Sequence, residues 1–341
     1  MSGRRAGFVL IAALWLLVAL GAVGLDAALR SRNRRLAAAN LVDETRARAA
    51  ALAGAEYVRS RLTAAMLDRA DELRADALSR ARNDRARQQA QGRSVSRLFR
   101  DADDPMNDPW RAPDELIATE MTFGDARYSV RVRDTGAALN LNEASEEVLR
   151  QFFSQGMGVD YARSDRLTQA ILDWRDEDEL PRINGGEREQ YLREGALILP
   201  PNRDFAEIAE LRHVMGMTPD LFDAARPFLT IFGSGDVNVN AAPLEVLLAL
   251  PAMTPGTAQE IVRMRDAGNY AEDEDELVEM LGGAGEELED SGPFGRMTTY
   301  ATNEVEIVVD GRVEGSPMVV RARVIVARSD AGAVVVWRRI D

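Results

Sequence analysis

The chain begins with an uninterrupted apolar run and then becomes polar. Residues Phe8 to Leu25 include no charged side chain over 18 positions. As an α-helix that rises about 1.5 Å per residue, this run spans roughly 27 Å, close to the thickness of the hydrocarbon core of a bilayer. The pattern predicts one membrane-spanning segment, residues 8–29, followed by a large polar body.

Helical spacing continues beyond the apolar run. Residues 26–98 are rich in Ala, Arg, Leu and Glu and contain no Pro. We therefore expect one long helix to leave the membrane and to continue through residues 30–98. After Arg69 large apolar residues become rare, so the last part is expected to fray or to form a separate helix. Residues 101–113 contain three Pro and several Asp, which predicts a loop.

Alternating apolar and polar residues predict β-structure at both ends of the polar body. Strands are expected over residues 116–123 and 127–133, with a turn at Gly124 and Asp125 between them. Three more strands are expected near the C-terminus, at residues 305–309, 318–327 and 334–337, with turns at residues 310–311 and 330–332.

The two groups of strands enclose a long helical section, so a sheet divided by an insertion is the simplest interpretation. We predict an α+β fold in which a long N-terminal helix accompanies a small antiparallel sheet. The sheet is assigned to residues 114–138 and 297–341, and a large inserted all-α domain to residues 139–296.

The inserted section contains an internal repeat. LNLNEASEEVL begins at Leu139 and VNVNAAPLEVL begins 98 residues later. Asn140 and Asn142 of the first copy match Asn238 and Asn240 of the second. The second Asn of each pair precedes a predicted helix, where we expect its side chain to cap exposed backbone N–H groups. The repeat predicts two related structural units.

Composition narrows the range of functions. The net charge is −14, and an acidic surface repels phosphate backbones, which argues against nucleic-acid binding. The absence of Cys excludes disulfides and thiolate chemistry, and a single histidine, His213, argues against a zinc site. The chain also lacks the P-loop, dinucleotide-binding and nucleophile-elbow motifs, so no enzyme class is indicated.

An acidic run, residues 173–179, offers candidate metal ligands. Asp176, Asp178 and Glu187 fall at positions 1, 3 and 12 of an EF-hand frame, but Leu180 and Pro181 occupy positions 5 and 6, so this is not an EF-hand loop. Two interpretations remain open from the residues alone. The run is either a solvated charge cluster or a calcium site, because calcium takes six to eight oxygen ligands from carboxylates and carbonyls.

The N-terminus resembles the substrate of a prepilin peptidase. The basic leader MSGRRAG, residues 1–7, ends in Gly7 and is followed by Phe8 and the apolar run. The resemblance implies cleavage between Gly7 and Phe8 and N-methylation of Phe8; a plain signal anchor is the alternative. Most pilins carry Glu as the fifth mature residue, where this chain has Ala12. Within the family, pseudopilin K typically lacks that Glu.

The order of motifs in the inserted section resembles the minor pseudopilin K family of type II secretion systems. The matching motifs are Asp173–Asp178, Gly186–Glu187, Tyr191, Asn202 and Glu210-Leu211-Arg212. The resemblance implies calcium, one or two ions, in the α-domain. The first candidate ligands are Asp176, Asp178 and Glu187, and the further candidates are Asp173, Glu189 and Asn202.

The same resemblance implies a non-enzymatic subunit at the tip of a pseudopilus, which nucleates and caps a filament that exports folded proteins. Expected partners are the I-type and J-type minor pseudopilins, prepilin peptidase and secreted substrates, and no nucleic acid. The expected location is the bacterial inner membrane, with a cytoplasmic N-terminus and a periplasmic body. Two alternatives stay open: a membrane-anchored DNA-uptake protein, because Asn-x-Asn-x-Ala openings resemble helix-hairpin-helix modules, and a signal-anchored calcium-dependent periplasmic enzyme.

Overall fold

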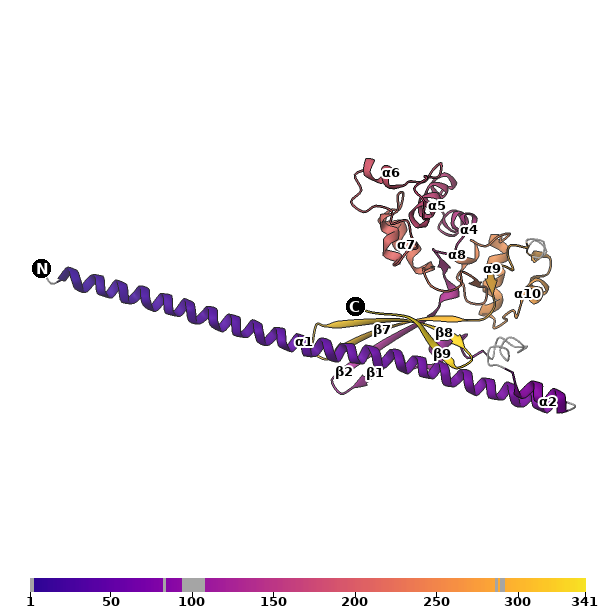
Figure 1. Ribbon diagram of the computed structural model, residues 1–341, viewed down its shortest axis with the longest axis horizontal. Helices are drawn as coiled ribbons and strands as arrows, with labels where there is room; N and C mark the ends of the chain where they lie inside the picture. Colours follow the sequence, from indigo (N-terminus) through magenta and orange to yellow (C-terminus); the bar gives the residue numbers. More distant parts are fainter. Residues whose placement is uncertain (1–2, 82–83, 94–107, 286–287, 289–291) are drawn as a thin grey trace.

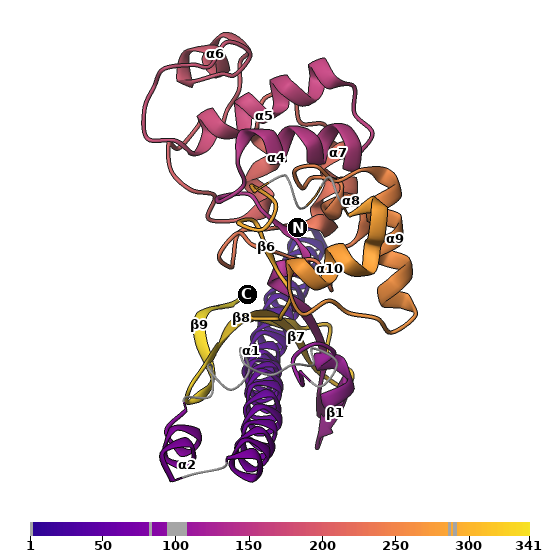
Figure 2. The ribbon, with the colours of Figure 1, turned by 90° about the vertical axis from the view of Figure 1, so that its right-hand side faces the viewer.

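The computed structural model describes residues 3–81, 84–93, 108–285, 288 and 292–341. A long helix runs along one face of a sheet, and a helical head lies on the other face (Figures 1 and 2). The head is placed toward the end of the molecule that is far from the N-terminus (Figure 1). The sheet therefore lies between the head and the part of the long helix that is far from the N-terminus.

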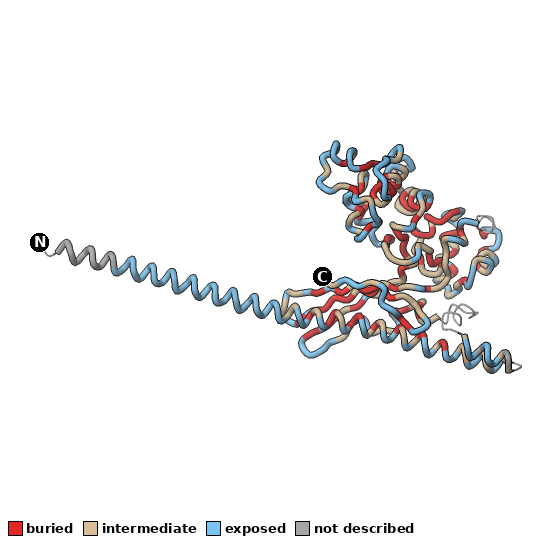
Figure 3. Tube along the Cα trace, viewed as in Figure 1, coloured by how far each residue is buried: buried red, intermediate tan, exposed pale blue. Residues whose placement is uncertain are grey.

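Helix α1 (Gly3–Arg80) dominates the N-terminal part. Its side chains are exposed over residues 13–42 (Figure 3), and the helix then buries a stripe of small and apolar residues against the sheet. The stripe consists of Ala47, Ala50, Ala51, Ala55, Val58, Leu62, Met66 and Ala70. Spacings of three and four residues keep these side chains on one helix face. Among the described residues, α1 is the one helix long and apolar enough to cross a bilayer.

The prediction of a helix that continues through residue 98 is wrong, whereas the expectation of a separate helix after Arg69 is confirmed. Helix α1 ends at Arg80, and a short helix α2 (Asp84–Gln91) follows it. Leu73 is the last residue of α1 in the core between the helix and the sheet, and the Arg/Asp-rich sequence beyond it adds no side chain to that core. Most of the predicted loop over residues 101–113 lies outside the described residues; its described end buries Trp110, whose Nε1 donates to the Leu62 carbonyl (3.3 Å).

Five strands of the described chain form an antiparallel sheet in the order β1-β2-β7-β8-β9. Their bounds are Glu120–Phe123, Ala126–Asp134, Glu304–Val313, Val319–Ser329 and Gly332–Ile340. Strands β2 and β7 are neighbours, although about 170 residues lie between them in sequence, and Asp134 pairs with Val305. The head is therefore inserted between two adjacent strands. Strand β1 begins at Glu120 rather than at residue 116, because Pro113 starts a 3-10 turn, η2 (Pro113–Leu116).

The predicted turn at Asp310 and Gly311 is also wrong, since β7 continues through both residues to Val313. The buried Asp310 carboxylate accepts hydrogen bonds from Arg321 Nε (2.7 Å) and Arg131 Nη2 (3.3 Å), which offset its desolvation. Gly311 faces α1, where a Cβ would lie 2.0 Å from the Ala47 carbonyl oxygen. This glycine therefore permits close packing of helix on strand, and the turn comes later, around Gly315.

Replacing Gly311 by Ala should destabilise the protein, because α1 would have to move away from β7 to admit the methyl group. Overpacking of this kind costs about 1–3 kcal/mol or more. Gly256→Ala is the matched control, since the nearest atom to its added Cβ, Thr254 Oγ1, is 3.8 Å away. Urea unfolding measures both variants, and equal midpoints for the two would contradict the close approach of helix and strand.

The head has its own hydrophobic core, separate from the core between α1 and the sheet. Its helices are α4 (Glu146–Gln151), α5 (Tyr161–Arg175), α6 (Arg188–Arg193), α7 (Pro219–Ala225), α8 (Leu244–Leu247), α9 (Pro255–Asp266) and α10 (Glu274–Leu281). Short 3-10 segments are η3 (Thr135–Ala137), η5 (Ile208–His213), η6 (Arg226–Phe228) and η7 (Gly282–Ala284), and η4 (Phe152–Gly156) is a π-helical turn. Short parallel pairs join β3 (Leu139–Asn140) to β4 (Leu229–Thr230) and β5 (Val237–Asn238) to β6 (Thr298–Thr299).

Candidate metal centre and the paired modules of the head

The two copies of the Asn repeat build equivalent connections, but they do not cap helices as predicted. Asn142 and Asn240 each stand four residues before the first residue of α4 and α8, too far upstream to be an N-cap. Ser145 caps α4 instead, and α8 follows Pro243 without a side-chain cap.

The Asn side chains instead bind backbone that is distant in sequence. Asn142 bonds both backbone groups of Phe205: its Nδ2 donates to the carbonyl (3.1 Å) and its Oδ1 accepts from the N–H (2.9 Å). Asn240 does the same with Ala271, at 2.7 and 3.1 Å. Asn140 and Asn238 accept from the N–H of Asn142 and Asn240. In each module, one Asn side-chain amide therefore forms the two hydrogen bonds that the backbone of a neighbouring β-strand would form.

Two arginines that the sequence analysis missed complete this symmetry. Arg175, at the end of α5, donates to the carbonyls of Leu141 and Ala144. Arg265, near the end of α9, donates to those of Val239 and Ala242, which are the equivalent positions of the second copy. Burial lowers the pKa of both guanidinium groups. The offset between the two arginines is 90 residues rather than 98, so alignment of the repeat does not pair them.

Three carboxylates meet beyond the end of α5. Asp176 directly follows the helix, Asp178 lies in the next loop and Glu187 directly precedes α6. One oxygen from each lies within 4.8 Å of the others. Glu187 is 2% exposed, and within the described part of the chain neither of its carboxylate oxygens has a hydrogen-bond donor; the same holds for Asp176 Oδ1. Buried anions without donors are expensive, so this arrangement fits a bound cation.

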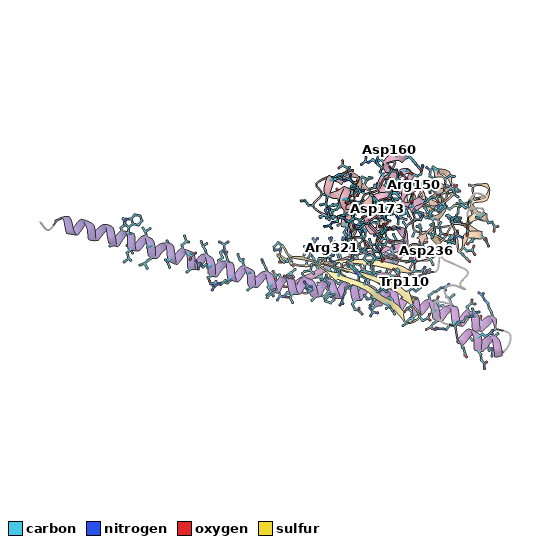
Figure 4. The ribbon with its side chains drawn as sticks, turned by 45° about the horizontal axis from the view of Figure 1, so that its top comes forward. Trp110, Arg150, Asp160, Asp173, Asp236 and Arg321 are labelled. Atoms are coloured by element: carbon cyan, nitrogen blue, oxygen red, sulfur yellow. The ribbon has the colours of Figure 1, made fainter. Side chains whose placement is uncertain are left out.

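The loop between α5 and α6 is folded back by Asp173, which lies inside the head (Figure 4). The Asp173 carboxylate accepts from the backbone N–H of Arg182 (3.1 Å) and from its Nη1 (2.6 Å). Arg182 Nη1 also bonds Asp176 Oδ2, which leaves Oδ1 of Asp176 to face the cluster. Gly185 allows this approach, because a Cβ there would lie 2.1 Å from Asp173 Oδ2.

The structure separates the predicted ligands into two groups. It brings together the three first candidates, whereas Asp173 is engaged by Arg182 and Glu189 is exposed on α6. Asn202 has a positive φ of 49° and its Nδ2 donates to the Asp178 carbonyl, so its amide holds the loop. The assignment of all six predicted residues as calcium ligands stays a prediction.

The chemistry of the donor set favours a hard cation. Carboxylate and carbonyl oxygens are the ligands that calcium takes, and the sulfur ligands that structural zinc sites commonly use are absent from the sequence. Burial raises the pKa of Glu187 to about 7, and the neighbouring charges of Asp173, Asp176, Asp178 and Glu179 act in the same direction. A divalent cation would reverse this repulsion.

Without a cation, the protein should lose stability as the pH rises from about 4.5 to 7. The pKa of Glu187 is raised from 4.5 to about 7 in the folded state, so the folded chain binds the proton more tightly. The protonated Glu187 therefore contributes roughly 3 kcal/mol to the free energy of unfolding. This contribution is fully present below pH 4.5 and is lost as the pH rises through about 7. Urea unfolding of metal-free protein at several pH values measures the slope. The same slope in Glu187→Gln would contradict the assignment.

The prepilin-type processing site is not tested by these contacts. Gly7 and Phe8 lie in the first turns of α1, where the side chains are outside the described residues. Cleavage between them and methylation of Phe8 stay predictions.

Comparison with known proteins relates the helical head to one family. Two family models, both described as type II secretion system protein K, match residues 131–234 and 237–292. Their common boundary falls where the second Asn module begins, at Val237. The two models therefore correspond to the two modules of the head.

Curated relatives carry the same description. The type II secretion system protein K of Klebsiella pneumoniae is 27% identical over 169 residues, 44% of this chain and 52% of the relative. That of Dickeya chrysanthemi is 31% identical over 116 residues, 32% of each chain, and that of Pseudomonas aeruginosa is 26% identical over 185 residues, 50% of this chain and 54% of the relative. The chain thus matches about half the length of the longer-matching relatives.

A solved structure confirms the α+β fold class. The crystal structure of the GspK-GspI-GspJ complex from the enterotoxigenic Escherichia coli type 2 secretion system contains a chain that matches with a TM-score of 0.57 and 18% identity. The match covers 81% of this chain and 95% of that chain.

The described chain combines one apolar helix long enough to cross a membrane once with a small antiparallel sheet and an inserted helical head, an arrangement that fits a membrane-anchored protein. The inserted head is similar to the protein K family of the type II secretion system, as both family models and the curated relatives indicate.

Proposed function

We propose that this protein is the tip subunit of a type II secretion pseudopilus, where it nucleates and caps the filament that exports folded proteins across the outer membrane. The observation that carries this proposal is the head inserted between β2 and β7, which lies over the sheet at the end away from the membrane helix (Figure 1). A body of this size in that place would prevent another subunit from stacking above it.

The membrane segment supports a first position in the filament. If cleavage follows Gly7, the fifth mature residue is Ala12, an uncharged side chain. In pilins the Glu at that position is thought to pair with the terminal amine of a neighbouring subunit, and an unpaired charge inside a bilayer is expensive. A subunit that starts the filament has no such neighbour to engage, so Ala12 fits that position.

The proposed partners are I-type and J-type minor pseudopilins, because the similar structure is a complex of GspK with GspI and GspJ. The exposed surface of α1 over residues 13–42 is the part of the chain suited to lateral packing with such helices (Figure 3). Prepilin peptidase and secreted substrates complete the proposed partners. We place the N-terminus in the cytoplasm and the body in the periplasm, and propose a structural role without catalysis.

Calcium is proposed as the ion that braces the loop between α5 and α6. Asp176, Asp178 and Glu187 would supply three carboxylate ligands, and carbonyls and water the remainder. The ion would supply positive charge and would fix the loop between α5 and α6. The ion pair between Asp173 and Arg182 (2.6 Å) would position the same loop. No observation favours the DNA-uptake or enzyme alternatives.

Co-expression of the full chain with I-type and J-type pseudopilins tests the proposed function. We expect the three to co-purify in detergent as one complex with a single copy of each. The control variant is Arg263→Ala, which removes an ion pair with Glu260 on the surface of the head and should leave the complex intact. Recovery of this chain without either partner would contradict the proposal.

A further inference from the structure

A cluster of arginines follows the membrane span directly. Arg30, Arg32, Arg34 and Arg35, here called the arginine belt, lie within ten residues of Leu25. Residues 26–42 of α1 carry four Arg and one Asp, whereas residues 43–80 carry seven Arg and seven Asp or Glu. The belt is therefore a local excess of positive charge on a chain whose net charge is −14.

Farther along α1, five of the seven arginines of residues 43–80 pair with an acid of the same helix. Arg48 pairs with Glu44, Arg69 with Glu72 and Arg74 with Asp71, at three or four residues' separation. The belt differs because Arg32 and Arg34 have no acidic residue three or four positions away in the sequence. The single acid of residues 26–42, Asp26, is taken by Arg30 (2.8 Å).

Arg35 in turn donates to the Ser31 hydroxyl (3.3 Å), which leaves its charge uncompensated. All four belt side chains are exposed, on a part of α1 that extends away from the sheet and the head (Figures 3 and 4). The positive charge of the belt is therefore presented outward along a bare stretch of helix.

The position of the belt matches the headgroup layer. Arg30 lies about 7.5 Å and Arg35 about 15 Å along the helix from Leu25, at roughly 1.5 Å per residue. The headgroup regions add about 5–8 Å to each side of the hydrocarbon core. Side chains of an α-helix tilt toward its N-terminus, which for this helix is the direction of the membrane. Long Arg side chains can therefore reach back to the interface while their stems cover the helix.

We propose that the arginine belt binds the anionic headgroups of phospholipids on the side of the membrane from which the body extends. A guanidinium group binds a phosphate through two parallel hydrogen bonds, and basic residues beside a membrane span contribute about fivefold each to the binding of anionic lipid. The bound lipids fix the depth of α1 in the bilayer until the subunit leaves it for a filament. This inference needs the membrane anchor but neither the calcium site nor the tip position.

Lipid is favoured over an acidic protein partner because the belt is continuous with the apolar span. Any helix with this sequence that crosses a bilayer over residues 8–25 carries the belt into the interface, whether or not another subunit is present. The positive charge of the belt attracts the anionic headgroups of phosphatidylglycerol and cardiolipin, whereas zwitterionic headgroups carry no net charge.

Native mass spectrometry of the full chain in non-ionic detergent tests the proposal. We expect the wild-type chain to retain phosphatidylglycerol at least tenfold more than phosphatidylcholine at equal concentrations. The triple variant R32Q/R34Q/R35Q should lose most of this preference, and R32K/R34K/R35K should keep most of it because the charge remains. The matched control R69Q/R74Q/R80Q removes three cations from the same helix far from the membrane and should behave as wild type.

Further arms separate headgroup binding from other sources of the same signal. Inorganic phosphate at millimolar concentration should not displace phosphatidylglycerol, because the lipid is also held by its chains. Equal retention of the two lipids by the wild type would overturn the proposal, as would an equal loss in the two Gln triples. One further outcome would overturn the proposal: the wild type shows no lipid preference, and the arginine belt contacts acidic residues of the co-purified I-type and J-type subunits. The belt would then be assigned to a protein partner.

Discussion

Removal of calcium is expected to lower the melting temperature of the head by about 5–10 °C at pH 7.5. A ligand present at 100 times its dissociation constant stabilises the folded state by about 2.7 kcal/mol, and a domain of this size shifts by roughly 2–4 °C for each kcal/mol. The physical reason is that the buried Glu187 carboxylate and Asp176 Oδ1 have no donors among the described residues. Thermal unfolding with calcium and after chelation with EGTA measures the shift.

Glu187→Gln should change this result in two opposite ways. The neutral amide keeps the shape of the side chain and removes the repulsion from Asp173, Asp176 and Asp178. The variant is therefore expected to be more stable than the wild type in EGTA, and to lose the gain from calcium. Glu194→Gln, on the exposed end of α6, is the control and should respond to calcium as the wild type does. A calcium response that persists in Glu187→Gln would refute the site.

Deletion of the head is expected to leave a folded pseudopilin that no longer terminates a filament. Asp134 and Val305 are paired residues of β2 and β7, so residues 135–304 can be replaced by a two-residue Asn-Gly hairpin turn. The core between α1 and the sheet is separate from that of the head, and should survive. The deletion also removes Phe232, which packs on Trp337 of β9 with ring centroids 4.8 Å apart.

With the headless chain in place of the full one, pseudopili should grow severalfold longer, and secretion should fall. Electron microscopy of sheared filaments measures their length, and the Gly256→Ala chain, whose head is intact, controls for the handling of variants. Filaments of unchanged length, from a headless chain that is shown to be folded and incorporated, would contradict the role of the head as a cap.

Much of the architecture follows from hydrophobic patterning. The 18-residue run without charge predicts the membrane segment, and the alternating segments predict the strands on both sides of the insertion. The errors have a local physical cause. Asp310-Gly311 resembles a turn, but the aspartate is neutralised by arginines of β2 and β8 and the glycine admits α1. Tertiary contacts of this kind are not encoded in the local sequence.

The candidate site shows the same limit. The resemblance to pseudopilin K, together with the spacing of the acidic residues, predicts Asp176, Asp178 and Glu187 as the first ligands. The separation of Asp173 from this group depends on Arg182, whose position follows from the loop. The Asn pairs were visible as a repeat, yet their partners, Phe205 and Ala271, lie 63 and 31 residues away. Such long-range hydrogen bonds leave no periodic signal in a single sequence.

The position of this subunit in assembled pseudopili tests the central claim most directly. Gold-labelled antibody against the head, applied to filaments that contain the full chain, is predicted to mark one end of each filament and no other position. Label distributed along the filament shafts would show that further subunits stack above this one, and would contradict the proposal that the head closes the tip.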